Sequence, residues 1–246
     1  MPELFGLIGY PLSHSFSPAY FKKKFTDRHI DAQYDLYPLA SIKEFPALIL
    51  SCPDLAGLSV TIPYKTSVIP YLDDIDPLAA EINAVNCIVC TEGRTKGFNT
   101  DVTGFRLSII PLLQPHHTHA LILGTGGASL AVAYTLKELG ITFQKVSRTK
   151  TVDTLVYEDI TPDIIAEHKL IINTTPLGMY PNPLNSPSIP YQYLSKDHLL
   201  YDVIYNPELT QFLLFGQQHG ANTKNGFEML QLQADASWDI WKNTKI

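Results

Sequence analysis

The sequence predicts an α/β fold in two domains, and three observations support this prediction. At 246 residues the chain exceeds the ~100 to 200 residues that one core usually spans. Short apolar runs alternate with helical patterns, which is typical of parallel βα units whose helices cover the sheet. The alternation starts afresh near residue 101. We therefore expect an N-terminal α/β domain with a mainly parallel sheet, followed by a second α/β domain.

The first hundred residues contain the elements of the N-terminal domain. Apolar or alternating runs predict strands at 4–9, 32–37, 58–62 and 85–90. Helices are expected at 18–25, 41–50, where Pro46 interrupts the pattern, and 77–84. Ser17 is expected to cap the first helix, with Pro18 at the first helical position. Pro63 ends the half-buried strand 58–62, and Lys65 follows where we expect a helix to start.

The second series begins with a helix at 102–113, capped by Thr100-Asp101. Continuous apolar runs then predict fully buried parallel strands. We expect strands at 120–123, 143–147, 170–173 and 199–204, and helices from the glycine turn to Leu139, at 162–168 and at 208–218. The segment 176–190 holds five prolines and is expected to form a long ordered loop.

The last expected helix, 227–241, has an apolar stripe. Phe227, Leu230, Ala234, Trp238 and Trp241 recur at intervals of three and four. Such a stripe is typical of a core face, and we expect it to return to the first domain. The expected domains are therefore 1–101 together with 220–246, and 102–219.

Composition excludes several classes of protein. Hydrophobic residues make up 45% of the chain and charged residues 17%, as in an ordinary globular protein. A net charge of -6 argues against a nucleic-acid partner. No apolar run reaches the ~18 residues of a membrane span, and MPELFGLIGYP lacks the features of a signal peptide. We expect a cytoplasmic protein with neither nucleic-acid nor membrane partners.

The cysteines and histidines do not predict a metal site. Three cysteines fit a reducing compartment. Cys87 and Cys90 form a C-x-x-C pair, but on a strand they would point to opposite faces, which favours core packing. His116, His117 and His119 fall in a loop without an acidic or cysteine partner, so we expect a surface turn.

The stretch HALILGTGGASLAVAYTLKELG carries the strongest motif. An apolar strand ends at Gly124, and an alanine-rich helix follows the glycine turn. Glycines there allow a sharp turn and let the backbone approach a pyrophosphate, whose charge the helix N-terminus then satisfies. Ser129 stands at the third glycine position, and a purely structural glycine turn is the alternative. The motif predicts a Rossmann-type dinucleotide-binding domain.

The next strand end, VSRTK, indicates which dinucleotide. It lacks the carboxylate that NAD sites place there for the ribose 2′-OH. Arg148 can pair with a 2′-phosphate, and Ser147 and Thr149 add hydroxyl donors. The sequence therefore predicts NADP(H). The turn Asn173-Thr174-Thr175-Pro176 ends another strand and is expected to border the same cofactor.

A hydride-transferring cofactor needs a partner that moves a proton, and Lys65 is the candidate. Other polar residues of the first domain share its place near strand ends and could converge on one cleft: Ser15, Ser17, Thr61, Asn86, Asn99, Thr100 and Asp101. The alternatives are a surface lysine, helix-capping serines and asparagines that only satisfy strand-end backbone.

Nine stretches carry a resemblance that spans residues 9 to 234. In order they are GYPLSHSFSP, GLSVTIPYK, INAVNCIV, GFNTDVTGF, LGTGGAS, SRT, NTTPLGM, YDVIYNPELTQFL and NGFEMLQLQA. With these the sequence closely resembles the shikimate dehydrogenase family. The resemblance implies an NADP-dependent oxidoreductase acting on a CH–OH group. Such enzymes reduce 3-dehydroshikimate to shikimate in chorismate and aromatic amino-acid biosynthesis.

The resemblance also implies roles for individual residues. Lys65 and Asp101 would form the catalytic pair, and the first domain would bind substrate. The implied substrate-binding residues are Ser15, Ser17, Thr61, Asn86, Tyr205 and Gln233. The implied cofactor-binding residues are Gly124, Thr125, Gly126, Gly127, Ala128, Ser147, Arg148, Thr149, Thr175, Val203 and Gly226. The only expected partner is the small-molecule substrate, for a monomer or homodimer.

Some positions depart from the family pattern. Thr125 replaces the usual alanine, Ser147 replaces an asparagine, and Val152 stands where a basic residue is common, so Lys150 is the expected substitute. The alternative to substrate binding is a position in the core for Tyr205 and a solvated helix edge for Gln233. Two rival functions remain: a quinate/shikimate dehydrogenase that uses NAD, and a non-catalytic NADP-binding regulator on the same scaffold.

Overall fold

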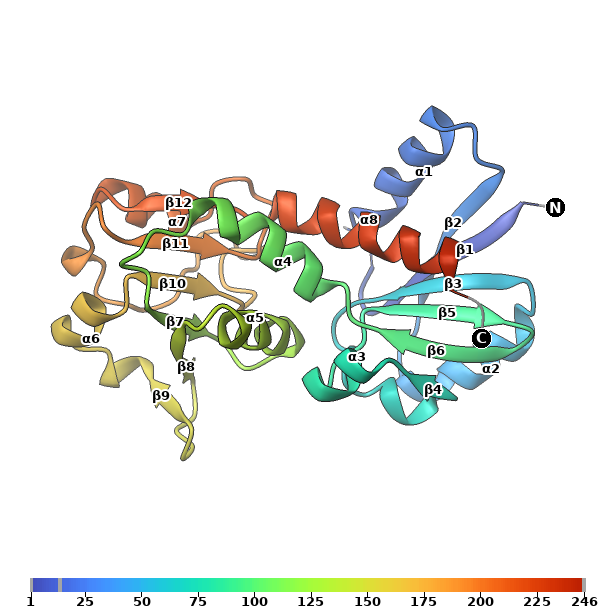
Figure 1. The fold of residues 1–246 in the computed structure, drawn as a ribbon, viewed down its shortest axis with the longest axis horizontal. Helices are drawn as coiled ribbons and strands as arrows, with labels where there is room; N and C mark the ends of the chain where they lie inside the picture. Colours follow the sequence, from blue (N-terminus) through green and yellow to red (C-terminus); the bar gives the residue numbers. More distant parts are fainter. Residues whose placement is uncertain (1, 13–14, 245–246) are drawn as a thin grey trace. The chain divides into compact units, whose positions relative to one another are not determined.

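The computed structural model describes residues 2–12 and 15–244, and the chain forms two units that each contain a six-stranded sheet (Figure 1). Unit 1 comprises Met1–Thr100 and Ala234–Ile246, and unit 2 comprises Asp101–Gln233. The predicted two-domain α/β fold is confirmed. Residues 220–233, which we expected with the first domain, belong to unit 2 because a strand and a core methionine of this segment join its sheet and core.

The sheet of unit 1 is mixed, with parallel pairings in the majority. Its strands are β1 (Glu3–Gly9), β2 (Ala32–Pro38), β3 (Leu55–Val60), β4 (Asp74–Ile75), β5 (Cys87–Thr91) and β6 (Arg94–Phe98). The spatial order is β2-β1-β3-β5-β6-β4. Three pairings are parallel, and β5 runs antiparallel to both β3 and β6. The hairpin β5–β6 turns at Glu92 and Gly93, whose φ values are 51° and 77°.

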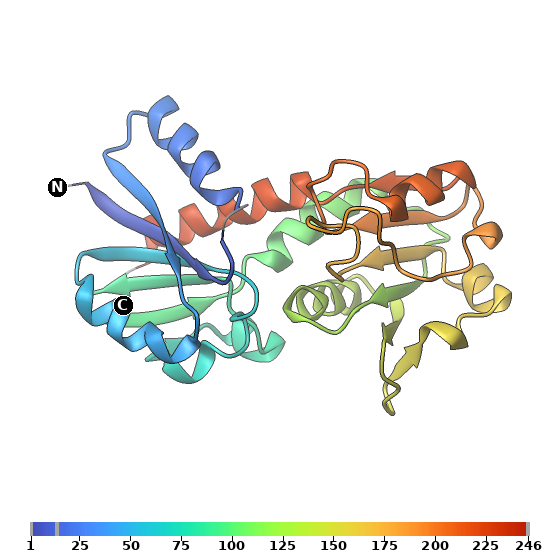
Figure 2. The same cartoon turned by 180° about the vertical axis from the view of Figure 1, so that it is seen from behind.

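Helices cover both faces of this sheet (Figure 2). Helix α1 (Ser17–Asp27) and the end of α8 (Phe227–Asn243) cover one face, where Phe5, Phe21 and Trp241 share a core. Helices α2 (Phe45–Ser51) and α3 (Pro77–Ile82) cover the other. Cys87 and Cys90 lie in these two different cores, as expected of strand residues three apart.

Three local predictions in unit 1 are wrong. Strand β3 ends at Val60 and not at Ile62, which lies beyond the strand and is 62% exposed. Its residues do not alternate between buried and exposed, because β3 is central and covered on both faces. Lys65 lies in turns before the 3-10 helix η2 (Ile69–Tyr71), not at a helix start. Ser17 is the first residue of α1 and does not cap it, since Phe16 occupies the cap position without a side-chain bond.

The sheet of unit 2 is entirely parallel. Its strands are β7 (His119–Leu123), β8 (Thr142–Ser147), β9 (Thr154–Val156), β10 (Leu170–Asn173), β11 (Leu199–Asp202) and β12 (Asn222–Lys224). The order β12-β11-β10-β7-β8-β9 reverses direction at β7, where the chain moves from one half of the sheet to the other. Numbered from β7, this is the 3-2-1-4-5-6 order of a Rossmann fold. The Rossmann-type prediction is confirmed.

Helices cover both faces of this second sheet as well. Helix α4 (Asp101–Ile109), α5 (Gly127–Glu138) and the first turns of α8 pack on one face, where Met229 joins the core. Helix α6 (Pro162–Glu167) and α7 (Gln211–Gln218) pack on the other. The segment 176–190 contains no helix or strand, as predicted, and its Ile189 is buried in that core.

The end of α8 completes the core of unit 1. Trp241 Nε1 donates to the carbonyl oxygen of Ile88 at 2.9 Å, and a side chain at Gly57 would collide with the Trp241 ring. Ala234 and Trp238 are buried beside it, whereas Phe227 is 42% exposed. The predicted return of the last helix to the first domain is therefore confirmed from Ala234 onward. Within residues 2–12 and 15–244, the helices are too short or too polar to span a membrane.

Candidate active site

The predicted polar residues of unit 1 gather at one edge of its sheet. Because β5 is antiparallel to β3, the start of β5 adjoins the end of β3. Val60 N–H donates to the carbonyl oxygen of Asn86 at 2.8 Å, and Asn86 N–H donates to that of Phe98 at 3.0 Å. The residues that follow β3 and β6 therefore lie beside Asn86. Thr61, Asn86 and Asn99 therefore lie near one another at this edge, and the convergence of all the predicted polar residues on one cleft stays a prediction.

Lys65 is anchored to this same edge through its backbone. Its carbonyl oxygen accepts the N–H of Val85 at 2.7 Å, which places Lys65 beside the residue that precedes Asn86. Thr61 N–H donates to the carbonyl oxygen of Ile8 at 2.9 Å, so the turn from Thr61 to Lys65, which follows β3, begins beside the end of β1. The Lys65 side chain is half-buried. The backbone of Lys65 therefore lies at this edge, and the catalytic role of its side chain stays a prediction.

Asn86 organises the backbone in front of Asp101. Its Oδ1 accepts the N–H of Thr100 at 2.7 Å, and its Nδ2 donates to Thr100 Oγ1 at 2.9 Å. Thr100 Oγ1 also shares a bond of 2.9 Å with Ser237 Oγ. Asn86, Thr100 and Ser237 are all at most 3% exposed. Sequence reasoning missed Ser237, because only the return of α8 brings it to this edge.

Asp101 and Asn99 flank Thr100. Asp101 is buried and opens α4, where the helix N-terminus favours a carboxylate. Asn99 Nδ2 donates to the carbonyl oxygen of Ala84 at 2.9 Å, so this asparagine does satisfy strand-end backbone. Asp101 belongs to unit 2 and Lys65 to unit 1. Their pairing stays a prediction.

The remaining predicted substrate residues are half-buried. Ser15 N–H donates to the carbonyl oxygen of Leu12 at 3.2 Å, and Ser17 opens α1. In unit 2, Gln233 Nε2 donates to the carbonyl oxygen of Leu230 at 2.8 Å, and Tyr205 follows β11 closely. The assembly of Ser15 and Ser17 with Tyr205 and Gln233 around one substrate stays a prediction.

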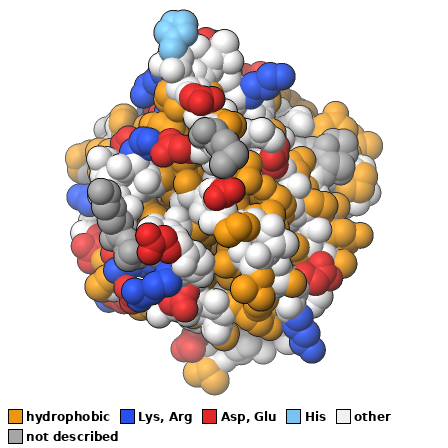
Figure 3. Space-filling model, turned by 90° about the vertical axis from the view of Figure 1, so that its right-hand side faces the viewer, with side chains coloured by type: hydrophobic (Ala, Val, Ile, Leu, Met, Phe, Trp, Pro, Cys, Tyr) orange, Lys and Arg blue, Asp and Glu red, His pale blue; other side chains and the backbone are white. Residues whose placement is uncertain are grey.

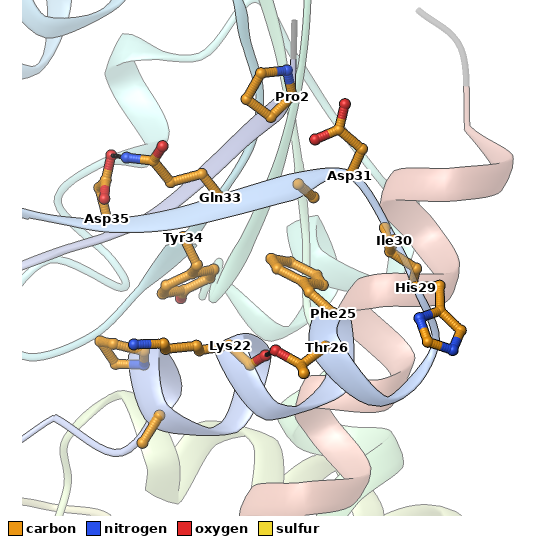
Figure 4. Close-up of a pocket in the computed structure, with 13 residues that line it drawn as sticks. Pro2, Lys22, Phe25, Thr26, His29, Ile30, Asp31, Gln33, Tyr34 and Asp35 are labelled. Atoms are coloured by element: carbon orange, nitrogen blue, oxygen red, sulfur yellow. Dashed lines mark hydrogen bonds between the residues drawn. The ribbon is translucent and has the colours of Figure 1, made fainter.

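An open pocket between α1 and β2 lies apart from these residues (Figure 4). Its rim carries Lys22, His29, Asp31 and Asp35, and Gln33 Nε2 donates to the Asp35 carboxylate at 2.7 Å. None of the residues predicted to bind substrate or cofactor lines it. It therefore does not form part of the candidate active site.

The glycine turn of unit 2 has the geometry of a phosphate cradle. Gly124 has φ 111°, a left-handed conformation, and a Cβ there would lie 2.8 Å from Thr174 Oγ1, so only glycine fits. Gly126 is the N-cap of α5, and a Cβ there would meet nothing within 4 Å. Ser129 is fully buried, and its Oγ donates to the carbonyl oxygen of Gly126 at 2.6 Å. This bond explains how a serine occupies the third glycine position.

Backbone bonds join the loops that follow four neighbouring strands. Gly124 N–H donates to the carbonyl oxygen of Val146 at 2.8 Å, and Thr174 N–H to that of Leu123 at 2.9 Å. Val203 N–H donates to the carbonyl oxygen of Asn173 at 3.0 Å. The predicted cofactor residues therefore lie along the carboxyl edge of the sheet, at its switch point between β7 and β10.

Gly226 lies against Val203. Its N–H donates to the carbonyl oxygen of Ile204 at 3.0 Å, and a Cβ on Gly226 would collide with the backbone of Val203. Two residues that are distant in sequence and that we predicted to contact the cofactor are thus adjacent in unit 2. Glycine is required here because of this close approach and not because of its φ value.

The end of β8 presents one cation without an acidic partner. Arg148 is exposed, and it forms no ion pair with a carboxylate in the described part of the chain. Lys150 Nζ lies 3.0 Å from Asp159 Oδ2, so this ion pair reduces the positive charge that Lys150 can offer. Val152 is fully exposed. The cationic character of this loop therefore rests on Arg148.

This set of residues fits an NADP molecule. The open N-terminus of α5 suits a pyrophosphate, and a hydroxyl of Ser147 stands where an NAD site would hold a carboxylate. Arg148 offers the bidentate donor that a 2′-phosphate requires. Among the described residues, no group of three histidine, cysteine, aspartate or glutamate side chains could hold a metal ion.

Asp202 of unit 2 was not predicted, and its partner Asn173 was expected only as part of the turn that borders the cofactor. Asn173 and Asp202 end neighbouring strands, are inaccessible to solvent and bond to each other, with Asn173 Nδ2 donating to Asp202 Oδ1 at 3.0 Å. Both stand inside the quoted motifs NTTPLGM and YDVIYNPELTQFL. Their position at adjacent ends of parallel strands could have identified them.

Comparisons with known proteins agree along the whole chain. Residues 7–88 match the family model described as "Shikimate dehydrogenase substrate binding domain". A relative named Shikimate dehydrogenase (NADP(+)) from Halothermothrix orenii is 38% identical over 267 residues, covering 99% of this chain and 92% of that protein. The crystal structure of shikimate dehydrogenase 1 from Peptoclostridium difficile has a TM-score of 0.87 at 35% identity, covering 100% of this chain and 93% of the other.

A solved structure with bound ligands is also similar. Shikimate 5-dehydrogenase from Thermus thermophilus, in complex with NADP(H) and shikimate, gives a TM-score of 0.87 at 28% identity and covers 99% of this chain and 94% of the other. Identity above 30% to full-length relatives shows common descent of the whole chain. The fold, the glycine cradle and these matches together place this protein in the shikimate dehydrogenase family.

Proposed function

We propose that the protein catalyses the reversible, NADPH-dependent reduction of 3-dehydroshikimate to shikimate. The observation that carries this proposal is the nearly full-length match to shikimate dehydrogenases named for NADP(+). The gathering of Lys65, Thr61 and Asn86 at one sheet edge of unit 1 supports it. So does the phosphate cradle of unit 2.

Lys65 supplies the proton in this proposal. As an ammonium it can donate to the carbonyl oxygen of 3-dehydroshikimate as that oxygen gains charge. The bound cofactor supplies the hydride. Asp101 orients the ammonium, and Asn86 together with Thr100 fixes the chain that carries Asp101. In the direction of shikimate oxidation, Lys65 accepts the proton.

Hydroxyl and amide groups bind the substrate. Shikimate carries one carboxylate and three hydroxyls, a pattern that suits serine, threonine, tyrosine, asparagine and glutamine side chains. Ser15, Ser17 and Tyr205 bind the carboxylate, since the motifs that carry them contain no arginine. Thr61, Asn86 and Gln233 bind the ring hydroxyls.

The residues at the carboxyl edge of the second sheet bind NADP(H). The turn Gly124 to Ala128 holds the pyrophosphate, and Arg148 with Ser147 and Thr149 holds the 2′-phosphate. Thr175, Val203 and Gly226 lie beside the nicotinamide.

No macromolecular partner is part of this proposal. The charge of -6 argues against a nucleic-acid partner. Acidic and basic side chains are interspersed with hydrophobic ones on the face of unit 1 in Figure 3, without a continuous basic patch among the residues coloured there. We place the enzyme in the cytoplasm as a monomer or homodimer.

A spectroscopic assay tests the proposed function. Purified protein is mixed with shikimate and NADP+, and the near-ultraviolet absorbance of NADPH is followed. Parallel reactions with NAD+ and with quinate distinguish the rival dehydrogenase, which would turn over quinate with NAD+ at a higher kcat/KM. A protein that binds NADPH but turns over neither substrate would instead be a regulator.

A further inference from the structure

A buried carboxylate lies at the carboxyl end of β11 in unit 2. Asp202 is inaccessible to solvent, and no cationic side chain in the described part of the chain pairs with it. Three donors surround it: Asn173 Nδ2 at 3.0 Å and Ile204 N–H at 3.0 Å on Oδ1, and Thr210 Oγ1 at 2.6 Å on Oδ2. A buried carboxylate without a cationic partner is costly, so its place in the fold requires an explanation.

Asn173 and Thr210, which contact the two oxygens of the Asp202 carboxylate, both donate to it. An ionised carboxylate only accepts, so Asn173 must turn its Nδ2 to Asp202 and its Oδ1 away. That Oδ1 accepts the N–H and Oγ1–H of Thr175 at 3.0 and 2.6 Å. On the other side, Thr210 Oγ1 accepts the N–H of Leu213 at 3.4 Å and caps α7. The carboxylate therefore fixes which way the Asn173 amide and the Thr210 hydroxyl point.

The network ends at residues assigned to the cofactor. Thr175 donates to Asn173, which in turn donates to Asp202. Val203 lies in the chain between Asp202 and Ile204, and the N–H of Ile204 donates to the Asp202 carboxylate. Val203 N–H also donates to the carbonyl oxygen of Asn173 at 3.0 Å. Asp202 itself lies beneath this surface because it is fully buried. It can affect a ligand only through Asn173, Thr175 and Val203.

We propose that Asp202 is a positioning residue whose ionised carboxylate orients Asn173 and so holds Thr175 and Val203 in the conformation that binds the nicotinamide half of NADP(H). This inference rests on the proposed function for the identity of the ligand. Protonation of Asp202 weakens the network, because bonds to a charged acceptor are stronger than bonds to a neutral one.

The pKa of Asp202 brings this change into an accessible pH range. Burial raises its pKa to about 6, and the bonds from Thr210, Ile204 and Asn173 only partly oppose this effect. Tyr201 on the same strand and Tyr191 of the 3-10 helix η5 (Tyr191–Tyr193) are the titratable groups that interact with it. Burial raises the pKa of both phenols above the ordinary value, so both stay neutral. Within this network, Asp202 alone changes charge between pH 5 and pH 7.

The test measures dissociation constants by the fluorescence of NADPH and NADH as a function of pH. For the wild type we expect both constants to rise roughly fivefold to tenfold as the pH falls from 7 to 5, with a midpoint near 6. NADH is the necessary control, because the 2′-phosphate of NADPH itself titrates at a pKa of about 6. In Asp202→Asn both constants should equal the wild-type values at pH 5 and lose this step.

A pair of substitutions at Thr210 supports the assignment. Thr210→Ser keeps the hydroxyl and should retain wild-type affinity and the pH step. Thr210→Val removes it and should weaken binding of both cofactors by roughly fivefold. If Asp202→Asn does not fold, as judged by circular dichroism, the wild-type NADH titration and the Thr210 pair still decide the question.

The outcomes separate this inference from the proposed function. Wild-type affinity and an unchanged pH step in Asp202→Asn would overturn the positioning role, as would an affinity of wild type for NADH that does not vary between pH 5 and pH 7. A protein that shows the step but leaves shikimate unoxidised contradicts only the proposed function. Failure to bind either cofactor at any pH refutes both.

Discussion

The carboxyl edges of the two sheets both depend on a buried asparagine, but the partners of the two asparagines differ. Asn86 in unit 1 accepts the N–H of Thr100 at 2.7 Å, and Asn173 in unit 2 accepts that of Thr175 at 3.0 Å. The network of Asn86 continues to the neutral hydroxyl of Ser237 through Thr100, whereas Asn173 donates to the carboxylate of Asp202.

This difference shows two ways of fixing a loop. A neutral network can reorient, because each hydroxyl both donates and accepts. A buried carboxylate fixes the direction of its bonds but destabilises the fold while it is ionised. The bonds from Asn86 to Thr100 and from Thr100 to Ser237 join neutral groups near the residue assigned to proton transfer. The bond from Asn173 to Asp202 joins an amide to a carboxylate near the residues assigned to the cofactor. Substitutions in the two units can test this division between chemistry and binding.

The largest effect is expected for Lys65→Ala. Loss of the proton donor should lower kcat by about 10²- to 10⁴-fold, while the dissociation constant for NADPH stays unchanged because the cradle belongs to unit 2. Steady-state kinetics and cofactor titration measure the two quantities. Lys96→Ala is the matched control, since Lys96 lies on β6 of the same unit, outside the candidate site, and forms an ion pair with Asp74. A Lys65→Ala enzyme of normal kcat would end the assignment.

The second effect concerns stability and pH in unit 2. The folded-state pKa of Asp202, about 6, lies above the ordinary ~3.9, so the protonated form favours the fold. This stabilisation is present below about pH 4 and is lost as the pH rises through about 6. Relative to Asp202→Asn, the wild type should therefore gain up to about 3 kcal/mol between pH 7 and pH 4. Urea unfolding followed by far-ultraviolet circular dichroism measures this difference, and a gap that does not vary with pH would contradict it.

Arg148→Ala should act on cofactor choice. Removing the guanidinium should raise KM for NADPH roughly tenfold to hundredfold and leave KM for NADH nearly unchanged, since only NADPH carries the 2′-phosphate. Lys150→Ala is the control and should have a smaller effect, because Lys150 is already paired with Asp159. An equal rise in KM for both cofactors would show that Arg148 does not bind the 2′-phosphate.

The last prediction concerns the free energy of unfolding of unit 1 in Asn86→Ala. Leaving Thr100 without its partner should lower the free energy of unfolding of unit 1 by about 1 to 3 kcal/mol. Both tryptophans lie in unit 1, so their fluorescence reports its unfolding. Gln33→Ala, a change at an exposed position, should leave it within about 0.5 kcal/mol. In contrast to Asp202→Asn, the loss should be the same at pH 5 and pH 7.

Local patterns predicted most of the elements. The glycine turn, the apolar strands of unit 2 and the stripe of α8 from Ala234 onward lie close to where the sequence placed them, because each depends on neighbours in the chain. The hairpin β5–β6 was missed, although Gly93 with positive φ marks its turn. Asn86 nonetheless lies at the expected edge, since β5 starts where its antiparallel neighbour β3 ends.

What the sequence could not predict depends on tertiary contacts. Ser237 reaches Thr100 only because α8 returns to unit 1, and the burial of Asp202 requires three segments to meet. Ser17 satisfies the pattern of a helix cap, but the chain enters α1 one residue earlier. The sequence around Lys65 did not predict the turns in which this residue lies. Propensity describes a residue and its sequence neighbours, and these features involve residues far apart in the chain.

The position of Trp241 has a consequence for synthesis. The ring fills the space over Gly57, stacks on Phe5 with ring centroids 4.9 Å apart and bonds to Ile88, so the core of unit 1 needs two segments that are far apart in the sequence. On the ribosome, N-terminal segments emerge first and usually fold first. Here the core of residues 1–100 stays incomplete until α8 has been synthesised, and a nascent chain that stops before α8 leaves an open apolar face for chaperones to cover.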